Sequence, residues 1–278
     1  MNVPASEEPS QPRREPLRPT MADLMLFVAG AAVAMAFHRV YNTSMRSVDA
    51  TPQYLMEWVI EPIRWCLFGV AAVVVARRIQ FGGGATPGEF LAMLVLAGTV
   101  VHLADLALFT GGVMWRGILT CLIFFVSAYL YGNARLGWPI WMRSLSLAFV
   151  VVSSSAFLVI LYLLLRPAWF DLATGRAMSF VLSSFMQYIA LIVAIRSAFG
   201  RGFARFPWTE GAGFCLYVAL WAVSHLYIYG VMIELNGGDS VLFVACSLLF
   251  EAIALAVSWM LVRRYAASVG PWLLGASR

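Results

Sequence analysis

The chain is poor in charged residues and contains no lysine. Only 12% of its 278 residues are charged, 62% are hydrophobic, and arginine supplies all 19 basic side chains. An average soluble domain has about 25% charged residues, so this chain has too little polar surface to cover a soluble globule of its length. The composition therefore predicts a protein that lies in lipid. The arginines stand at the ends of apolar segments, where membrane topology alone would place them, so the net charge of +5 indicates no nucleic-acid partner.

Sequence motifs of metal, disulfide, nucleotide and hydrolytic sites are also missing. Each cysteine stands alone inside an apolar run, with no C-x-x-C pair to hold zinc or form a disulfide framework. There is no H-E-x-x-H and no G-x-S-x-G. Gly83 and Gly88 have the spacing of a phosphate-binding loop, but Glu89 stands where the lysine would be. The sequence thus indicates no cofactor, no metal site and no catalytic residue, and it favours a function other than catalysis without excluding an enzyme.

Eight apolar segments have the length of a membrane-spanning helix. The hydrocarbon core of a bilayer is about 30 Å thick and needs about 20 apolar residues per helix. The segments cover approximately residues 20–41, 55–76, 88–110, 113–132, 144–165, 177–197, 210–233 and 241–262. Residues 1–19 are rich in Pro, Glu, Ser and Arg and are predicted to be a disordered arm. The predicted fold class is an all-α polytopic membrane helix bundle with eight transmembrane helices.

The first segment begins with a helix-capping pattern. Thr20 is placed to accept hydrogen bonds from free amides, and Asp23 follows three residues later. The stretch Thr20-Met21-Ala22-Asp23-Leu24-Met25, after an arm rich in proline and arginine, resembles the start of uncharacterised multipass membrane proteins of planctomycete-type bacteria. This resemblance covers about 25 residues and implies no activity. An alternative is a cleavable signal peptide, because small residues at Ala32, Ala34 and Ala36 follow a basic arm and an apolar run.

A nine-residue pattern, A-x-R-x-x-F-G-x-G, occurs at 76–84 and again at 194–202. Each copy is followed by a threonine, Thr86 or Thr209, and sixteen residues later by a histidine, His102 or His225. The pattern predicts a parallel tandem repeat of two four-helix membrane units, 20–132 and 143–264, with a short tail at 265–278. Coincidence is the alternative, because arginines and glycines are common where helices end. The distribution of arginines places both termini in the cytoplasm and the protein in the bacterial inner membrane.

Seven ionisable residues within these segments are the candidates for a binding site. A charge in lipid costs at least about 3 kcal/mol, so such groups usually face a protein interior or a water-filled cavity. His102 and Asp105 are three residues apart, on one face of a helix. The full set is Glu57, Glu61, Arg64, His102, Asp105, His225 and Glu251.

Each candidate also has a structural interpretation. Glu61 and Arg64 could form an ion pair within one helix near the interface, and His102 with Asp105 could only hold two helices together. His225 could be a packed residue, whereas Glu251, near the middle of its segment, has no interface to reach. If the groups converge, they could handle protons or cations, or the two histidines could coordinate an ion.

The leading functional hypothesis is a small transporter, or a membrane protein that binds a solute or ion, with its polar site in the outer half of the bundle. The expected partners are the lipid bilayer together with a small solute or ion, or other membrane subunits. The alternative hypothesis is a non-catalytic accessory or scaffold subunit of a membrane complex.

Overall fold

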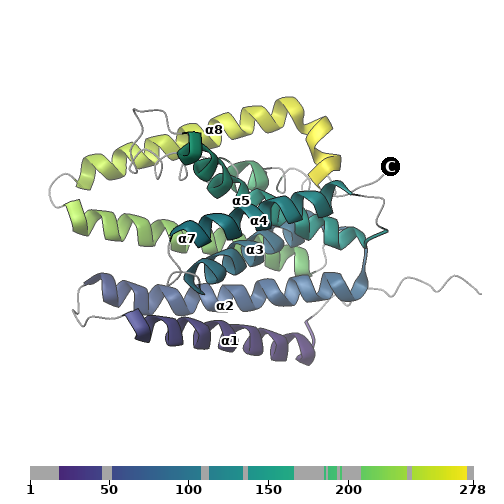
Figure 1. Ribbon diagram of the computed structural model, residues 1–278, viewed down its shortest axis with the longest axis horizontal. Helices are drawn as coiled ribbons and strands as arrows, with labels where there is room; N and C mark the ends of the chain where they lie inside the picture. Colours follow the sequence, from purple (N-terminus) through teal and green to yellow (C-terminus); the bar gives the residue numbers. More distant parts are fainter. Residues whose placement is uncertain are drawn as a thin grey trace, which may run out of the picture.

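The described part of the chain is entirely α-helical. The structure, a computed structural model, describes residues 19–45, 52–107, 113–133, 137–165, 185, 187–192, 195, 208–236 and 240–273. Its helices are α1 (Met21–Met45), α2 (Pro52–Phe81), α3 (Pro87–Ala107), α4 (Val113–Gly132), α5 (Ile140–Leu165), α7 (Trp208–Asn236) and α8 (Ser240–Leu273) (Figure 1). Each of these helices overlaps one predicted segment, and the segment predicted at 177–197 lies mostly outside the described residues.

The prediction of a polytopic membrane bundle with eight transmembrane helices is wrong. Over the ranges described, no helix combines the length and the apolar character that a bilayer crossing requires. Helix α2, for example, extends beyond the predicted apolar segment 55–76 to include Arg77 and Arg78, and it contains Pro62. The all-α class holds. The division into units at 20–132 and 143–264 stays a prediction, as do the arm at 1–19 and the tail at 265–278.

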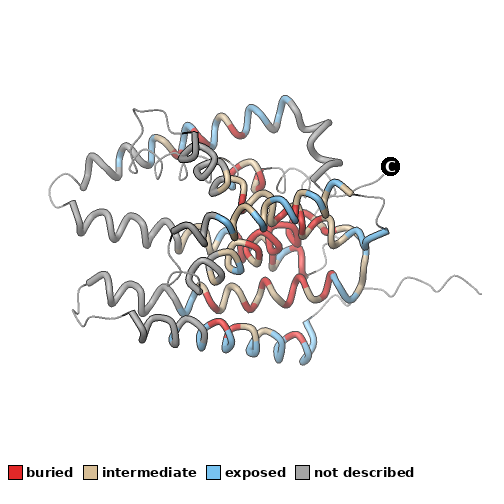
Figure 2. Tube along the Cα trace, viewed as in Figure 1, coloured by how far each residue is buried: buried red, intermediate tan, exposed pale blue. Residues whose placement is uncertain are grey.

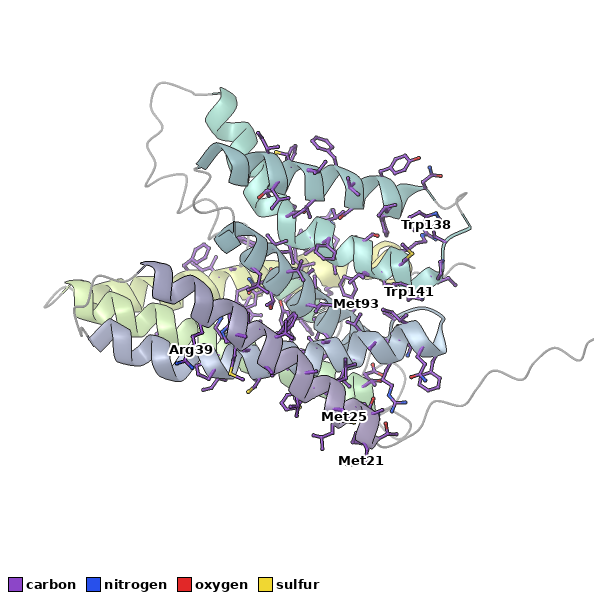
Figure 3. All side chains as sticks on the ribbon, turned by 60° about the horizontal axis from the view of Figure 1, so that its bottom comes forward. Met21, Met25, Arg39, Met93, Trp138 and Trp141 are labelled. Atoms are coloured by element: carbon purple, nitrogen blue, oxygen red, sulfur yellow. The ribbon has the colours of Figure 1, made fainter. Side chains whose placement is uncertain are left out.

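Burial is concentrated where α3 meets α2, α5 and α7, as Figure 2 shows. Helices α1, α4 and α8 lie around this centre and expose many large apolar side chains. On α1, for example, Met21 and Met25 point away from the bundle (Figure 3). By contrast, several buried side chains are polar, among them Asp23 on α1 and Glu251 and Ser258 on α8. The outer helices therefore present apolar surface outward and polar groups inward.

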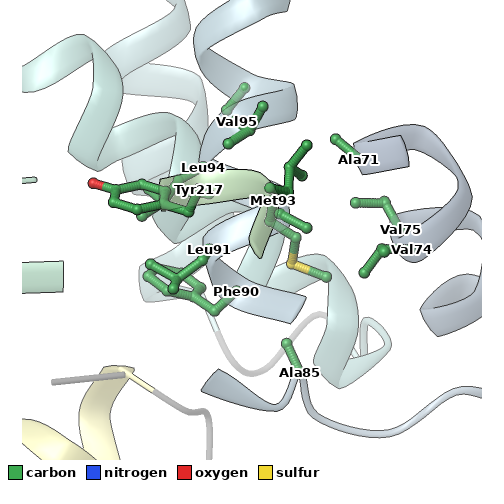
Figure 4. Packing of buried hydrophobic residues seen from close by; sticks show 14 of the residues in the cluster. Ala71, Val74, Val75, Ala85, Phe90, Leu91, Met93, Leu94, Val95 and Tyr217 are labelled. Carbon is green, nitrogen blue, oxygen red and sulfur yellow. The ribbon is translucent and has the colours of Figure 1, made fainter. Parts of the chain in front are cut away.

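Helix α3 is the centre of the hydrophobic core. Leu91, Ala92 and Met93 on α3 are completely buried, and Figure 4 shows residues of α2 and α7 packed around this helix. The cluster includes Val74 of α2, Ala148 of α5 and Tyr217 of α7, besides neighbours on α3. A helix that is apolar on all sides must be surrounded by other elements. This accounts for the central position of α3.

Helices α3 and α7 approach each other closely at their first turns. A Cβ atom built at Gly88 would lie 2.8 Å from the carbonyl carbon of Glu210, and one built at Gly213 would overlap the backbone of Gly88. Only glycine leaves room for two backbones at this separation. The contact brings together the two helix starts that follow Thr86 and Thr209, the equivalent threonines of the predicted repeat.

Local contacts define three helix ends, and the first of them confirms the predicted cap at Thr20 and Asp23. Thr20 and Asp23 cap α1, where the Thr20 amide donates to Asp23 Oδ2 at 2.6 Å. Thr86 and Glu89 cap α3, where the Thr86 amide donates to Glu89 Oε2 at 2.8 Å. Helix α2 ends at Gly82, whose φ of 70° is left-handed and whose amide donates to the Arg78 carbonyl. The F-G of the first pattern copy is therefore a helix stop.

Candidate functional site

Among the predicted site residues, the structure describes the side chains of Glu251 and Arg64. Glu251 lies on α8 and is 7% exposed, and Arg64 is partly buried on α2. Glu57 and Glu61 belong to α2, His102 and Asp105 to α3, and His225 to α7, but their side chains lie outside the described residues. The predicted meeting of the two histidines across a symmetry axis therefore stays a prediction.

Glu251 is held by a phenol inside the bundle. The Tyr188 hydroxyl donates to Glu251 Oε2 at 3.1 Å, and both residues are buried. The Tyr188 ring meets the Trp221 ring of α7 edge-on, with centroids 6.4 Å apart. Nearby in sequence, Tyr217 donates to the Gln187 carbonyl at 3.1 Å. The acidic side chain from α8 thus contacts Tyr188, whose ring in turn contacts Trp221 of α7.

Burial keeps the Tyr217 phenol of this region protonated. Its pKa is raised well above the usual 10, mainly because burial disfavours the phenolate and also because Tyr188 lies nearby. Tyr217 therefore remains a neutral donor at every physiological pH.

The buried face of α8 carries two polar residues, Glu251 and Ser258. Glu251, Ala254 and Ser258 have the spacing of one helical face, and all three are buried. Ser258 is completely buried, and its Oγ has no hydrogen-bond partner among the described residues. A buried hydroxyl normally makes a hydrogen bond because leaving it unsatisfied costs about 1–3 kcal/mol.

A second polar centre, which the sequence analysis did not identify, lies where α2 ends. The adjacent residues Arg77 and Arg78 reach two different helix caps. Arg77 donates to both carboxylate oxygens of Asp23 and, at 2.8 Å, to Thr20 Oγ1 at the start of α1. Arg78 donates to Glu89 Oε1 at 2.6 Å at the start of α3. We call these two arginines, with Asp23 and Glu89, the arginine clasp.

Glu89 links a fourth helix, α7, to the clasp. Thr209 at the start of α7 donates its hydroxyl to Glu89 Oε1 at 2.8 Å, and both side chains are fully buried. Glu89 Oε1 therefore receives hydrogen bonds from α2 and α7, while Oε2 receives the amide of Thr86. Three charge-assisted hydrogen bonds compensate for the burial of this carboxylate. The clasp joins four helix ends at one end of the bundle.

The sequence contained a signal for the clasp. Two T-x-x-acid capping patterns and a pair of arginines were visible, but the arginines were interpreted only as markers of topology. Pairing between helices 54 residues apart, as for Arg77 and Asp23, requires knowledge of which helix ends meet. Which helix ends meet depends on the tertiary fold, and the spacing of residues along the sequence does not contain this information.

Acid should weaken the α1 side of the clasp. Arg77 lowers the pKa of Asp23 from 3.8 to about 2 by hydrogen bonding, assisted by Thr20. A lowered folded-state pKa means that the pair stabilises the fold fully above pH 3.8, and that this contribution is lost as the pH falls towards 2. We expect the stability difference between the native protein and Asp23→Asn to be about 1 kcal/mol at neutral pH. Thermal melting from neutral pH down to pH ~2 should show this difference shrinking, and a constant difference would contradict the assignment.

Comparisons with known proteins add no family to this description. No protein-family model, curated protein or solved structure matches the chain. Within the described residues, no three His, Cys, Asp or Glu side chains are grouped so that they could hold a metal ion.

Proposed function

We propose that this protein binds a solute or ion, as a small transporter or a solute-binding protein, in contact with lipid at the bacterial inner membrane. The observation that carries the proposal is the inverted polarity of α8. Its inward face holds Glu251 and Ser258, while Leu249, Trp259 and Met260 are more than half exposed on its other faces. Buried polar groups and large exposed apolar patches are the informative exceptions to the usual pattern of burial.

Contact with lipid suits the exposed apolar side chains of these helices. The large apolar side chains that α1, α4 and α8 expose would be in contact with water if the protein were in solution. Each would then cost about 25 cal/mol per Å² of exposed apolar surface relative to burial. Leu122, Phe125 and Tyr129 extend the same exposed character along α4. Contact with lipid chains removes that cost without any protein partner. The polar inward face would then be available for a solute or ion.

Glu251 is the residue that we assign to ion or proton handling. Its carboxyl group is buried and accepts a hydrogen bond from the Tyr188 hydroxyl at 3.1 Å. Carboxylates that face the interior of an apolar helix bundle often mark ion or proton pathways. Ser258, two turns further along α8, offers a second polar contact on the same face. The two groups lie on the same buried face of α8.

Flux through reconstituted protein tests this function. Liposomes containing the full chain and a pH-sensitive dye would be given a membrane voltage with a potassium gradient and valinomycin. We expect voltage-driven proton entry that falls at least about ten-fold in Glu251→Gln, because the amide cannot exchange a proton. Leu255→Met, on the exposed side of the same helix, is the matched control and should retain full flux. Equal flux in Glu251→Gln and the control would rule out proton handling by this residue.

The second candidate function is an accessory or scaffold subunit of a membrane complex. The exposed apolar face of α4 favours it, because such a face also suits a protein partner. The two functions respond oppositely to mutation. Glu251→Gln should leave the assembly of a complex intact, whereas Phe125→Ser and Leu122→Ser together should release a partner. Crosslinking in membranes followed by native electrophoresis separates these outcomes.

A further inference from the structure

Helix α8 lies along the outside of the bundle and presents an apolar face to its surroundings (Figure 1). Glu251 and Ser258, seven residues apart, mark its buried side. Leu249, Ile253 and Met260 are 63%, 52% and 59% exposed. With 3.6 residues per turn, these three side chains share one face, and that face is opposite to the buried side. Helix α8 therefore has an apolar face that the described part of the chain leaves uncovered.

Two exposed arginines stand at the C-terminal end of this face. Arg263 comes three residues after Met260 and continues the same face, and Arg264 is exposed beside it. Trp259, which is 52% exposed, lies one turn before Arg263. Between residues 248 and 264 the one acidic residue is Glu251, and it is buried. The exposed face therefore carries positive charge at one end and no negative charge.

The charge on this face limits what can cover it. A second copy of the chain, related by a twofold axis, would place the same face against itself. In a parallel arrangement the arginines of the two copies would repel one another. In an antiparallel arrangement they would be buried against apolar side chains such as Leu249, without a negative partner. A suitable partner must therefore combine an apolar surface with negative charge at one end.

We propose that the exposed face of α8 binds anionic phospholipid, with the acyl chains along its apolar side chains and the phosphate at Arg263 and Arg264. The inference rests on the lipid contact of the proposed function and specifies the lipid. Arginine forms bidentate hydrogen bonds with phosphate. Trp259 lies between the apolar and the charged residues, which is the position that tryptophans take at a membrane interface.

The length of the apolar face also suits lipid. From Leu249 to Met260 it measures about 16 Å at a rise of 1.5 Å per residue. The hydrocarbon of one leaflet is about 15 Å deep, half of the full core. The face therefore matches the acyl chains of one leaflet, with the arginines at the level of its phosphates.

Quenching of tryptophan fluorescence by brominated lipids tests the proposal. The purified full chain would be reconstituted in phosphatidylcholine vesicles containing a small share of phospholipid with brominated acyl chains, either phosphatidylglycerol or phosphatidylcholine. Subtracting the signal of Trp259→Phe in the same vesicles gives the fluorescence of Trp259. We expect both lipids to quench Trp259, with an apparent association at least about five-fold stronger for the anionic lipid, the effect of one arginine beside an anionic headgroup.

A double variant and a matched control locate the charge effect. Arg263→Gln combined with Arg264→Gln should remove the preference for the anionic lipid, because the phosphate loses its cationic partners, and should leave quenching by the neutral lipid unchanged. Arg39→Gln is the control, since Arg39 is an exposed arginine on α1, and it should keep the preference. Added salt should weaken the preference, because salt screens exposed charges. Circular dichroism establishes that each variant keeps its helix content.

The proposal is overturned if neither lipid quenches Trp259, since a second copy or another protein would then cover the face. Equal association of the two lipids, or an unchanged preference in the double variant, would also overturn it. The remaining tryptophans, observed in Trp259→Phe, report whether the protein contacts lipid at all. Their quenching without that of Trp259 would refute the site on α8 and leave the lipid contact of the proposed function standing.

Discussion

Glu89→Ala will be the most destabilising single substitution in the arginine clasp, costing about 3–5 kcal/mol of unfolding free energy. The carboxylate is completely buried, and three groups donate to it: Arg78, Thr209 and the Thr86 amide. Alanine removes the acceptor for all three and leaves the Arg78 guanidinium buried beside a cavity. The unpaired charge, more than the lost contact, sets the size of the effect.

Three milder variants at Glu89 and Thr209 separate the effect of losing the charge from the effect of losing the packing around it. Glu89→Gln keeps the shape and one acceptor oxygen but turns the amide NH2 group towards a donor, so we expect roughly half of the alanine effect. Thr209→Val should cost about 1 kcal/mol, and Thr209→Ser, which keeps the hydroxyl, should cost less. Chemical unfolding of the purified proteins, followed by circular dichroism, gives these values. A loss below about 1 kcal/mol for Glu89→Ala would mean that the clasp is not a structural centre.

A double substitution tests whether the ion pair stabilises the fold or only avoids a penalty. Replacing Arg78 by Met and Glu89 by Leu removes both charges while keeping apolar volume. Buried pairs exchanged for apolar side chains are often neutral in stability. We therefore expect the double variant to recover part of the loss seen in Glu89→Ala. Full recovery is not expected, because Thr209 and the Thr86 amide would lose their acceptor.

Local patterns in the sequence were sufficient to place the helices. Capping residues at Thr20 and Thr86 and the glycine stop at Gly82 lie where the structure has helix ends. These features depend on neighbours within four residues, which is the range that sequence spacing describes. Composition was less reliable, since apolar windows led to the incorrect prediction of eight membrane-spanning helices.

The contacts between helices were beyond local reasoning. Nothing in the spacing of Arg77 and Arg78 says that one reaches α1 and the other α3. Likewise Trp208 becomes part of a pocket only because the start of α7 lies near α1 and α2. Glu251 could be singled out from sequence because a carboxylate deep in an apolar segment is costly wherever it packs. Its partner Tyr188, 63 residues away, could not.

Gly88→Ala will destabilise the contact between α3 and α7 by about 3 kcal/mol, the upper end of the range for overpacked cores. The added methyl group would meet the backbone of Glu210, 2.8 Å from its carbonyl carbon, and backbone cannot move aside as a flexible side chain can. Relief requires the two helices to separate, which would also lengthen the hydrogen bond between Thr209 and Glu89. Gly213→Ala meets the backbone of Gly88 from the other side and should have a similar effect.

Gly211→Ala is the matched control for this contact, since it lies on the same turn of α7 and a Cβ there meets no atom within 4 Å. Alanine has the higher helix propensity, so Gly211→Ala should be neutral or stabilising by up to about 1 kcal/mol. Unfolding curves for the three alanine variants would then separate by roughly 3 kcal/mol or more. If Gly88→Ala and Gly213→Ala unfold like Gly211→Ala, the two helices do not touch at their first turns. The joining of α7 to the clasp through Glu89 would then be incorrect as well, because Thr209 reaches Glu89 only when those turns are in contact.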